Sequence, residues 1–354
     1  MKSAAPREWR ALELLRSRLD PAQAARTAKS GKASGPSKTG KPGKSGKPGG
    51  VVLGIGDDCA VLAPLGQRSV WTTDACLENV HFRLDWASPA DVAHKSLNAA
   101  VSDVAAMGAR PLAALSHVTL SPRLDERALR SFARAQAAAA AELGCPIIGG
   151  NLAHGREFQV VTSVLGVMKG SARASKAVGP EPLLRSGARP GDEIWLVGEL
   201  GMARVGLELL QAGRRVTEPL ARACVRAQLR PRALVELGPR LLGRATACLD
   251  VSDGLVGDAD HLAGQSGVAL RLEAERLETL VSPAFEKLCR SLGHGALEAL
   301  LQGGEDYALL ATGPRARRPR FAKVLGRVER GRGVTLERAG VRVPLRGGFE
   351  HGAR

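Results

Sequence analysis

Residues 247–255 read Ala-Cys-Leu-Asp-Val-Ser-Asp-Gly-Leu, and the fold prediction begins from this stretch. The apolar run that opens it is typical of a buried strand, and Gly254 marks a turn into a helix expected over residues 255–265. Asp250 and Asp253 therefore lie at a strand-to-helix junction. Because a helix N-cap would explain one of these acids but not both, we expect the pair to bind a metal ion.

The same pattern, an acid directly after a short apolar run, occurs elsewhere in the chain. It recurs at Asp57 and Asp58 and at Asp74, while Glu305 and Asp306 lie between two glycines and the apolar run 307–310. Carboxylates at the ends of several strands can converge on one edge, where they repel one another unless cations neutralise them. Hard divalent cations prefer oxygen ligands. The sequence therefore predicts a magnesium-dependent site for a phosphorylated substrate.

The net charge of +16 is concentrated in two segments. Residues 26–50 contain Arg26 and six lysines without an acid, and residues 314–348 contain eleven Arg or Lys against Glu329 and Glu337. Their charges of +7 and +9 equal the whole net charge. We favour a solvated, arginine-rich surface, with a contact to RNA or DNA as the alternative. Neither an aromatic-interleaved basic stripe nor zinc-finger spacing supports that alternative, so we expect no nucleic-acid partner.

The cysteines are scattered, and no two form a Cys-x-x-Cys pair. They are Cys59, Cys76, Cys145, Cys224, Cys248 and Cys289. This distribution argues against a zinc site or a disulfide framework and favours a reducing compartment. Because no apolar run approaches the roughly 18 residues of a membrane span, we expect no membrane contact and a cytoplasmic protein.

A chain of 354 residues is long enough for two domains, each with its own core. We expect an N-terminal helix within residues 1–25, and a flexible Lys/Gly/Ser/Pro-rich linker at 26–50. An N-terminal domain at 51–183 and a C-terminal domain at 184–354 follow. The boundary near residue 184 is placed at the turn-rich segment Leu-Arg-Ser-Gly-Ala-Arg-Pro-Gly-Asp.

From residue 51 onward, apolar patterns with strand and helix spacing alternate, which indicates an α/β or α+β protein. Strands are expected at 113–120, 145–148, 158–168, 193–197 and 268–272. Helices are expected at 89–107, 125–143, 202–212, 219–242 and 255–265.

Five sequence elements, taken in their order along the chain, resemble one known family. They are residues 54–62 (Gly-Ile-Gly-Asp-Asp-Cys-Ala-Val-Leu), 72–74 with 78–82, 102–111, 249–255 and 303–307. Together they are similar to the thiamine-monophosphate kinase family, in the aminoimidazole ribonucleotide synthetase superfamily. The resemblance covers roughly residues 51–312, with a further match at 348–351.

The resemblance implies a fold and an activity. The fold would be the two-domain aminoimidazole ribonucleotide synthetase-like fold, an N-terminal sheet domain plus a C-terminal α/β domain, in a homodimer whose N-terminal domains pair their sheets. The activity would be in-line transfer of the γ-phosphate of ATP to thiamine monophosphate, which gives thiamine diphosphate. Such transfer requires positioning and charge neutralisation by Mg²⁺ more than a protein nucleophile, so we expect no catalytic nucleophile.

The resemblance also implies roles for individual residues. The metal ligands would be Asp58, Thr72, Thr73, Asp74, Asp103, Asn151, Asp250 and Asp253. ATP would contact Gly149, Gly150, Arg185 and Ser252. Thiamine monophosphate would contact His81, Glu305 and Phe349. The Thr72–Asp74 segment matches a metal-binding strand end of the family.

Asn151 departs from the family pattern, because many members carry Asp at this position. An amide oxygen can still bind Mg²⁺, but it brings no negative charge. We therefore expect one metal ion to bind more weakly, through water, or not at all.

Two other classes of protein remain as alternatives. The first is another enzyme of the superfamily, such as selenophosphate synthetase or the hydrogenase-maturation dehydratase, which usually carry a reactive residue in an N-terminal Gly-rich loop or a terminal cysteine. Residues 26–50 contain no cysteine, and the chain ends in Gly-Ala-Arg. The second is a non-catalytic nucleotide- or nucleic-acid-binding module, against which the retained acids argue.

Overall fold

The structure is a computed structural model that describes residues 66–168, 180–213, 216–343 and 345, together with the backbone of two short strands before residue 66. Those strands are β1 (Val51–Leu53) and β2 (Val61–Leu62), which pair antiparallel. The helix expected within residues 1–25 and the linker expected at 26–50 lie outside the described residues. The chain divides into two compact units. The first comprises residues 1–100 and 111–167, and the second comprises 101–110 and 168–354.

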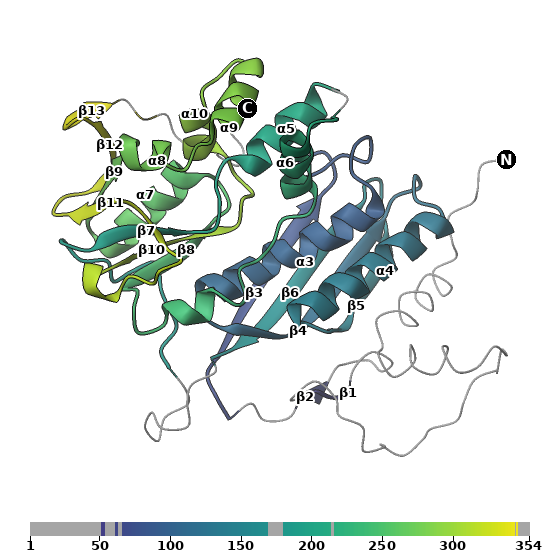
Figure 1. Ribbon diagram of the computed structural model, residues 1–354. Helices are drawn as coiled ribbons and strands as arrows, with labels where there is room; N and C mark the ends of the chain where they lie inside the picture. The colour runs from purple at the N-terminus through teal and green to yellow at the C-terminus, as the bar shows by residue number, and fades with distance from the viewer. Residues whose placement is uncertain are drawn as a thin grey trace. The chain divides into compact units, whose positions relative to one another are not determined.

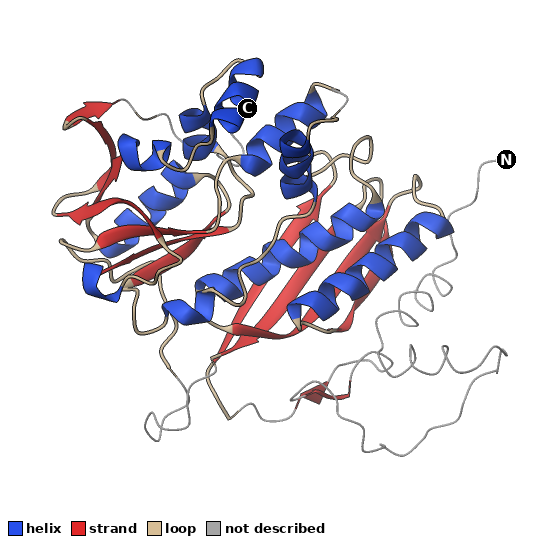
Figure 2. Ribbon diagram, viewed as in Figure 1, coloured by secondary structure: helices blue, strands red, loops and turns tan. Residues whose placement is uncertain are grey.

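The first unit is built on a four-stranded sheet in the order β3-β6-β4-β5. The strands are β3 (Ser69–Leu77), β4 (Arg110–Leu120), β5 (Ile147–His154) and β6 (Gln159–Val167). Strand β3 pairs antiparallel with β6, and β4 pairs parallel with β5. Figures 1 and 2 show helices α3 (Pro89–Ala106) and α4 (Glu126–Leu143) side by side on one face of this sheet.

Local sequence signals explain where these two helices begin and end. Helix α4 starts after Asp125, whose carboxylate accepts the Ala128 backbone N–H at 2.8 Å, and it ends at Gly144 in the left-handed conformation. Helix α3 starts at Pro89 behind Ser88, whose hydroxyl donates to Asp91 at 2.6 Å. The sequence predicted both helices, and the structure confirms them to within one or two residues.

The second unit contains a seven-stranded sheet in the order β13-β12-β9-β11-β7-β10-β8. Its strands are β7 (Glu193–Val197), β8 (Ala247–Val251), β9 (Ala269–Glu273), β10 (Ala308–Gly313), β11 (Lys323–Glu329), β12 (Gly333–Arg338) and β13 (Val341–Val343). All neighbours pair antiparallel except β12 and β9, which pair parallel.

Helices and 3₁₀ turns complete the second unit. They are α5 (Met202–Gln211), α6 (Pro219–Leu229), η1 (Gly238–Leu241), α7 (Leu255–Ser266), α8 (Ala274–Glu278), α9 (Pro283–Ser291), α10 (Ala296–Gln302) and η2 (Arg315–Arg317). Along β7, Ile194 and Leu196 join one buried apolar cluster and Trp195 and Val197 join another. Both faces of the sheet are therefore buried, which explains why β7 is a continuous apolar run in the sequence.

Two sequence predictions about element boundaries were wrong. A single helix over 219–242 does not form, because α6 ends before Arg230, which has φ −138° and ψ 66° and precedes Pro231. Proline disfavours helical backbone in the residue before it. The strand expected at 145–148 begins at Ile147 and continues to His154, because its whole length pairs with β4.

Among the described residues, no helix combines the length and apolar character that a membrane span requires. The chain has the mixed α/β architecture that the sequence predicted, with a sheet in each unit.

Candidate active site

Asp250 is the buried centre of a polar group in the second unit. It lies in β8, is 6% exposed, and its Oδ2 accepts the Ser102 hydroxyl of α3 at 2.6 Å. Burial raises the pKa of Asp250 to about 7, with a further rise from the Asp103 charge, while Ser102 and the Arg185 charge oppose the rise. Two further predicted site residues, Asp103 and Arg185, thus affect Asp250 through their charges, from two other segments of the chain.

The loop that follows β8 is held by a carboxylate from the next helix. Oδ2 of Asp258, in the first turn of α7, accepts the backbone N–H groups of Ser252, Asp253 and Gly254 at 3.0, 3.0 and 3.1 Å. Asp258 is 5% exposed, and burial raises its pKa to about 7 against the N–H bonds that lower it. Because one carboxylate oxygen binds three consecutive backbone N–H groups, the backbone of Ser252 and Asp253 is held in place without a bound ligand.

A second loop, residues 303–307, runs beside the first. The backbone N–H of Glu305 donates to the Ser252 carbonyl at 2.7 Å, and that of Tyr307 donates to the Val251 carbonyl at 2.9 Å. Glu305 and Tyr307 have φ values of 62° and 51°, which side chains with a Cβ rarely adopt. The second loop approaches the first closely at Gly304, where a Cβ would lie only 2.6 Å from the Ser252 carbonyl oxygen, so a larger residue would clash there. Such left-handed residues concentrate at functional sites.

A side chain of α6 and backbone N–H groups at the start of α5 fix the second loop. Oε2 of Glu305 accepts the Gln228 side-chain amide of α6 at 2.6 Å. The next residue, Asp306, accepts the backbone N–H groups of Gly201 and Ala203 at the start of α5, at 2.6 and 3.0 Å. The acid predicted to contact substrate is therefore held by a buried glutamine, and its neighbour is tied to a helix N-terminus.

In the first unit, Thr72, Thr73 and Asp74 lie in the middle of β3, not at a strand end as predicted. The strand continues because the next three residues also pair with β6. Thr73 receives a hydrogen bond from the Ser163 hydroxyl at 3.0 Å, and Oδ1 of Asp74 accepts the Ala75 backbone N–H at 2.7 Å. Thr73 is exposed, whereas Thr72 and Asp74, which point to the opposite face of the strand, are partly exposed.

Gly149, Gly150 and Asn151 lie inside β5. A Cβ at Gly150 would lie 1.8 Å from the Ser116 carbonyl of β4, so strand pairing alone already requires glycine there. Oδ1 of Asn151 accepts the Leu152 backbone N–H at 2.9 Å, the same local bond that Asp74 makes to Ala75. Asn151 thus presents its amide as Asp74 presents its carboxylate.

His81 follows β3, and its ring is oriented by a backbone contact. Nδ1 accepts the Leu77 N–H at 3.1 Å, while the His81 carbonyl accepts the Lys95 ammonium at 3.1 Å. Because Nδ1 is the acceptor, the proton of the neutral ring is on Nε2. The imidazole therefore presents an N–H donor, as the predicted contact with a substrate phosphate requires.

Two predicted site residues, Asp58 and Phe349, lie outside the described residues. The other predicted ligands are divided by sequence between the first unit (Thr72, Thr73, Asp74 and Asn151) and the second (Asp103, Asp250 and Asp253). In the described part of the chain, no three His, Cys, Asp or Glu side chains form a metal-binding group.

The residues around Asp250 nevertheless have the chemistry that Mg²⁺ requires. The donors are carboxylate and hydroxyl oxygens, which hard divalent cations prefer. The repulsion by which Asp103 raises the pKa of Asp250 is also the interaction that a bound cation would relieve. The second-unit residues therefore fit a magnesium ion.

Four residues that shape the site were not predicted from the sequence. They are Ser102, Gln228 and Asp258, together with Asp306, which was named only as one of the converging acids and not as a residue that binds backbone N–H groups. Asp258 is the one with a readable signal, since an acid in the first turn of a helix after a Gly-containing turn often binds free backbone N–H groups. Ser102 and Gln228 gain their roles from partners 148 and 77 positions away, which local patterns do not reveal.

The sequence matches two family descriptions over most of its length. Residues 56–168 match "AIR synthase related protein, N-terminal domain", and residues 189–338 match "AIR synthase related protein, C-terminal domain". Together these matches cover more than half of the chain.

Individual proteins give a narrower comparison. The chain is 34% identical to "Thiamine-monophosphate kinase" of Aquifex aeolicus over 80% of this chain and 89% of that protein. It is 35% identical to the Salmonella typhimurium protein of the same name, over 78% and 81%. The solved structure "AaThiL complexed with AMPPCP and TMP" superposes with a TM-score of 0.72 at 34% identity, covering 83% of this chain and 90% of that chain. The chain therefore belongs to the AIR synthase related family and, within it, to the thiamine-monophosphate kinases.

Proposed function

We propose that this chain transfers the γ-phosphate of ATP to thiamine monophosphate and so forms thiamine diphosphate, by direct in-line transfer that depends on Mg²⁺. The relatives that bear this name match it over about four fifths of the chain, and AaThiL was solved with AMPPCP and TMP. The observation that carries the proposal is the environment of Asp250, a buried carboxylate that accepts the Ser102 hydroxyl and is affected by the charges of Asp103 and Arg185.

In this proposal the second unit supplies a fixed set of oxygens. Asp250 and Asp103 would hold Mg²⁺ together with Asp253, whose loop is fixed by Asp258. When bound, the ions would neutralise charge on the donor and acceptor phosphates and on the transferred group. In the first unit, Asp58, Thr72, Thr73, Asp74 and Asn151 are the proposed ligands.

The remaining roles concern binding and orientation. We assign ATP contacts to Gly149, Gly150, Arg185 and Ser252. Arg185 suits this role because a guanidinium binds phosphate oxygens through two parallel N–H bonds.

We assign the substrate contacts to His81, Glu305 and Phe349. His81 would donate its Nε2–H to the acceptor phosphate, since Nδ1 already accepts the Leu77 N–H. Glu305 would accept a hydrogen bond from the substrate ring, in the orientation that Gln228 holds.

We further propose a homodimer formed by the sheets of two first units. Ser116 faces α4, since Gln136 of α4 donates to its hydroxyl at 2.8 Å, so the adjacent Leu115 points to the opposite face. Leu115 is 39% exposed, and Trp71 on β3 is 67% exposed. Large apolar side chains exposed on a sheet face are typical of an interface. Sedimentation velocity of the wild type and of Trp71→Asp tests this, and a monomeric wild type would refute it.

We place the enzyme in the cytoplasm on the basis of its cysteines. Cys76, Cys145, Cys224, Cys248 and Cys289 are buried free thiols, as expected in a reducing compartment.

The experiment that tests the proposed function is product formation by the purified wild-type protein. Thiamine monophosphate, ATP and Mg²⁺ are supplied, with and without excess chelator, and thiamine diphosphate is measured by chromatography. The expected result is product that disappears in the chelator. A folded protein that binds ATP but forms no thiamine diphosphate would contradict the proposal.

A further inference from the structure

A basic pocket lies in the second unit, away from the Asp250 loops. It has a volume of about 670 Å³ and lies between the end of α8 and the segment that leads from η2 into β11. Its walls carry the cations Arg276, Arg318, Arg320 and Lys323, with apolar surface from side chains that include Leu280 and Val324. This volume falls in the range of small-molecule sites, about 300–1,000 Å³.

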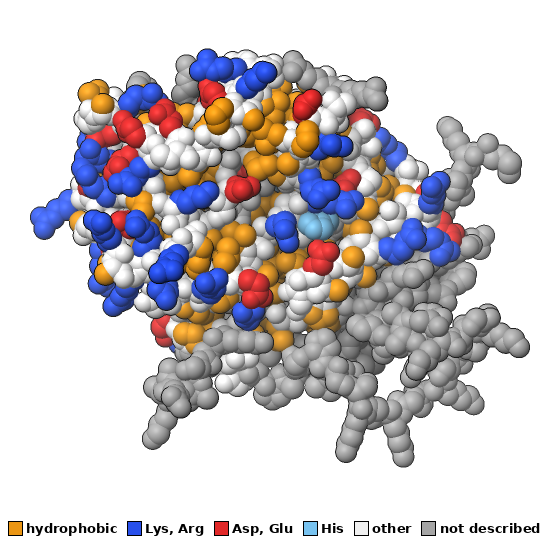
Figure 3. Space-filling model, in the orientation of Figure 1, with side chains coloured by type: hydrophobic (Ala, Val, Ile, Leu, Met, Phe, Trp, Pro, Cys, Tyr) orange, Lys and Arg blue, Asp and Glu red, His pale blue; other side chains and the backbone are white. Residues whose placement is uncertain are grey.

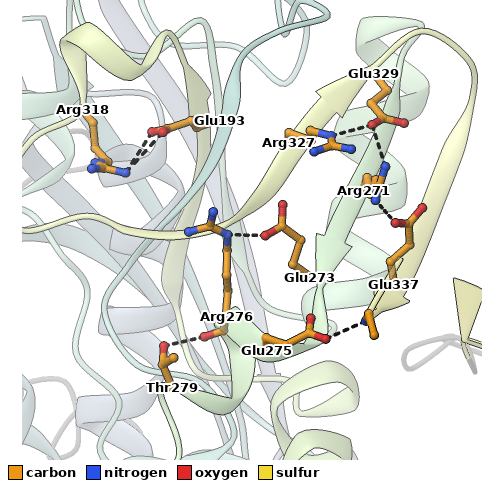
Figure 4. A network of polar contacts seen from close by, with 11 residues as sticks. Glu193, Arg271, Glu273, Glu275, Arg276, Thr279, Arg318, Arg327, Glu329 and Glu337 are labelled. Atoms are coloured by element: carbon orange, nitrogen blue, oxygen red, sulfur yellow. Dashed lines mark hydrogen bonds and ion pairs between the residues drawn. The ribbon is translucent and has the colours of Figure 1, made fainter. Parts of the chain in front are cut away.

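The positive charge of this pocket is only partly balanced. Arg276 binds Glu273, and Arg318 binds Glu193 with 3.2 Å between the charged atoms. Figure 4 shows both arginines reaching to these acids. Arg320 and Lys323 are exposed, and within the described residues neither pairs with an acid. None of the described side chains that line the pocket is acidic.

Further basic side chains lie on the surface of the second unit. Figure 3 shows Lys and Arg side chains gathered over the strands at the left of the view, where β9, β11, β12 and β13 lie. Several arginines there are paired with acids, as in the network of Arg271, Arg327 and Glu329 drawn in Figure 4. Among the cations that line the pocket, Arg320 and Lys323 are therefore the two whose charges remain available to a ligand from solution.

We infer that this pocket binds a small molecule that carries a diphosphate group on an apolar body. Arginine guanidinium groups bind phosphate oxygens through two parallel N–H bonds, and a concave wall with excess positive charge concentrates anions. Two available cations would offset much of the negative charge of a diphosphate. Leu280 and Val324, with the buried Pro319, provide a surface for the organic part of the ligand.

A small molecule fits the pocket better than a nucleic-acid strand does. Proteins that bind single strands combine basic side chains with aromatic rings on which bases stack. The aromatic ring in this segment, Phe321, is covered by the Arg240 guanidinium, 4.5 Å from its centroid. The ring is therefore already occupied by the protein itself.

The pocket is distinct from the candidate active site. In the sheet, β11 is separated from β8 by β7 and β10, so three strand spacings of about 4.8 Å, roughly 14 Å, separate the two strands. None of its lining residues is among those assigned to ATP, metal or thiamine monophosphate. The inference therefore holds whether or not the proposed kinase activity is found.

The test is calorimetric titration of the full chain in excess chelator, so that metal-dependent binding does not contribute. The probes are inorganic diphosphate, ADP and thiamine diphosphate, at one fixed ionic strength. ADP and thiamine diphosphate distinguish two sources of the same group, and either one should bind more tightly than inorganic diphosphate. Arg320→Ala/Lys323→Ala should weaken this binding by about tenfold or more.

The matched control is Arg330→Ala/Arg332→Ala, which removes the same charge from exposed arginines outside the pocket. It should change affinity by less than about twofold. Equal weakening in both double variants, or no weakening in the first, would overturn the inference. So would an organic diphosphate no tighter than inorganic diphosphate, or an RNA oligomer that alone depends on Arg320 and Lys323. Kinase turnover of Arg320→Ala/Lys323→Ala should stay within about twofold of wild type, which separates this site from the proposed activity.

Discussion

The oxygen ligands predicted for the two units are held in different ways. In the first unit, Asp74 and Asn151 lie inside strands with their side chains at an accessible surface, and each accepts the next backbone N–H. In the second unit, Asp250 is 6% exposed and is contacted by Ser102 from another segment. The loop that follows it is fixed by three hydrogen bonds to Asp258.

This difference predicts how well each unit would tolerate the replacement of a site side chain. Strand pairing sets the position of Asp74 and Asn151, so a side-chain replacement there leaves the backbone in place. The second-unit loops depend on buried polar contacts between distant segments, where a lost partner leaves an unsatisfied group. We therefore expect large effects from the second unit and small ones from Asn151.

The largest effect is expected from Asp250→Asn. The amide can still accept the Ser102 hydroxyl, so the fold should persist, but the charge that would bind Mg²⁺ is lost. Turnover should fall by about 10³-fold, as when a preorganised electrostatic group is removed. Turnover at saturating substrate and the melting temperature are the measurements. Ser102→Ala, which keeps the carboxylate, should lose only about tenfold. A folded Asp250→Asn with near-normal turnover would remove this carboxylate from the site.

A smaller loss of turnover, now combined with lower stability, is expected from Asp258→Ala. Three backbone N–H groups lose their acceptor, which should lower the free energy of unfolding by about 3 kcal/mol. Turnover should fall by about 10²-fold, because Ser252 and Asp253 would no longer be held. Urea unfolding and steady-state kinetics measure the two effects. If stability falls and turnover does not, the loop is a structural cap and not a positioning device.

Asn151→Asp tests the first-unit side of the comparison. The new carboxylate can keep the bond to the Leu152 N–H, and it adds a charged ligand at an exposed strand position. Turnover should change by less than about fivefold, and half-maximal activity should need less Mg²⁺. A magnesium titration of wild type and variant gives both values. A severe loss of turnover would show that activity is as sensitive to replacement at this strand position as it is in the loop after β8.

The smallest effect is expected from His294→Gln, at a buried contact outside both loops. His294 Nε2 lies 2.6 Å from Glu208 Oε2. Burial lowers the pKa of His294, but the Gly295 carbonyl and Glu208 outweigh it, so the net shift is upward. A raised pKa stabilises the fold below about pH 6.5, and this contribution is lost as the pH rises through the folded-state value.

The variant should therefore be less stable than wild type at pH 5.5, by less than about 1 kcal/mol, and closer to it at pH 8.5. Turnover should be unchanged at either pH. Urea unfolding at the two pH values is the measurement. A stability difference that grows toward pH 8.5 would contradict the sign of the pKa shift.

Much of the fold could be predicted from the sequence because its signals are local. Residues 194–197 of the strand Glu193–Val197 form an unbroken apolar run, and α3 begins at Pro89, directly after Ser88. The acids after Leu249 were placed at a strand-to-helix junction, and they lie where β8 leads into α7. Each of these features depends on neighbours within a few positions.

The parts that escaped prediction depend on distant partners. The length of β5 follows from its pairing with β4, and the role of Gln228 follows from Glu305, which is 77 positions away. The parallel pairing of β12 with β9 also joins separate segments. Residue spacing along one chain carries no signal for such contacts, so the acids could be named in advance but not the groups that hold them.

The most direct test of the account is thiamine diphosphate formation by Asp253→Asn beside the wild type. Asp253 is partly exposed, and its backbone position depends on Asp258 rather than on its own carboxylate, so the replacement should leave the fold intact. We expect Mg²⁺-dependent product from the wild type and at least about a 10²-fold loss in the variant, at an unchanged melting temperature. Equal turnover in the two proteins, or no product from a folded wild type, would contradict it.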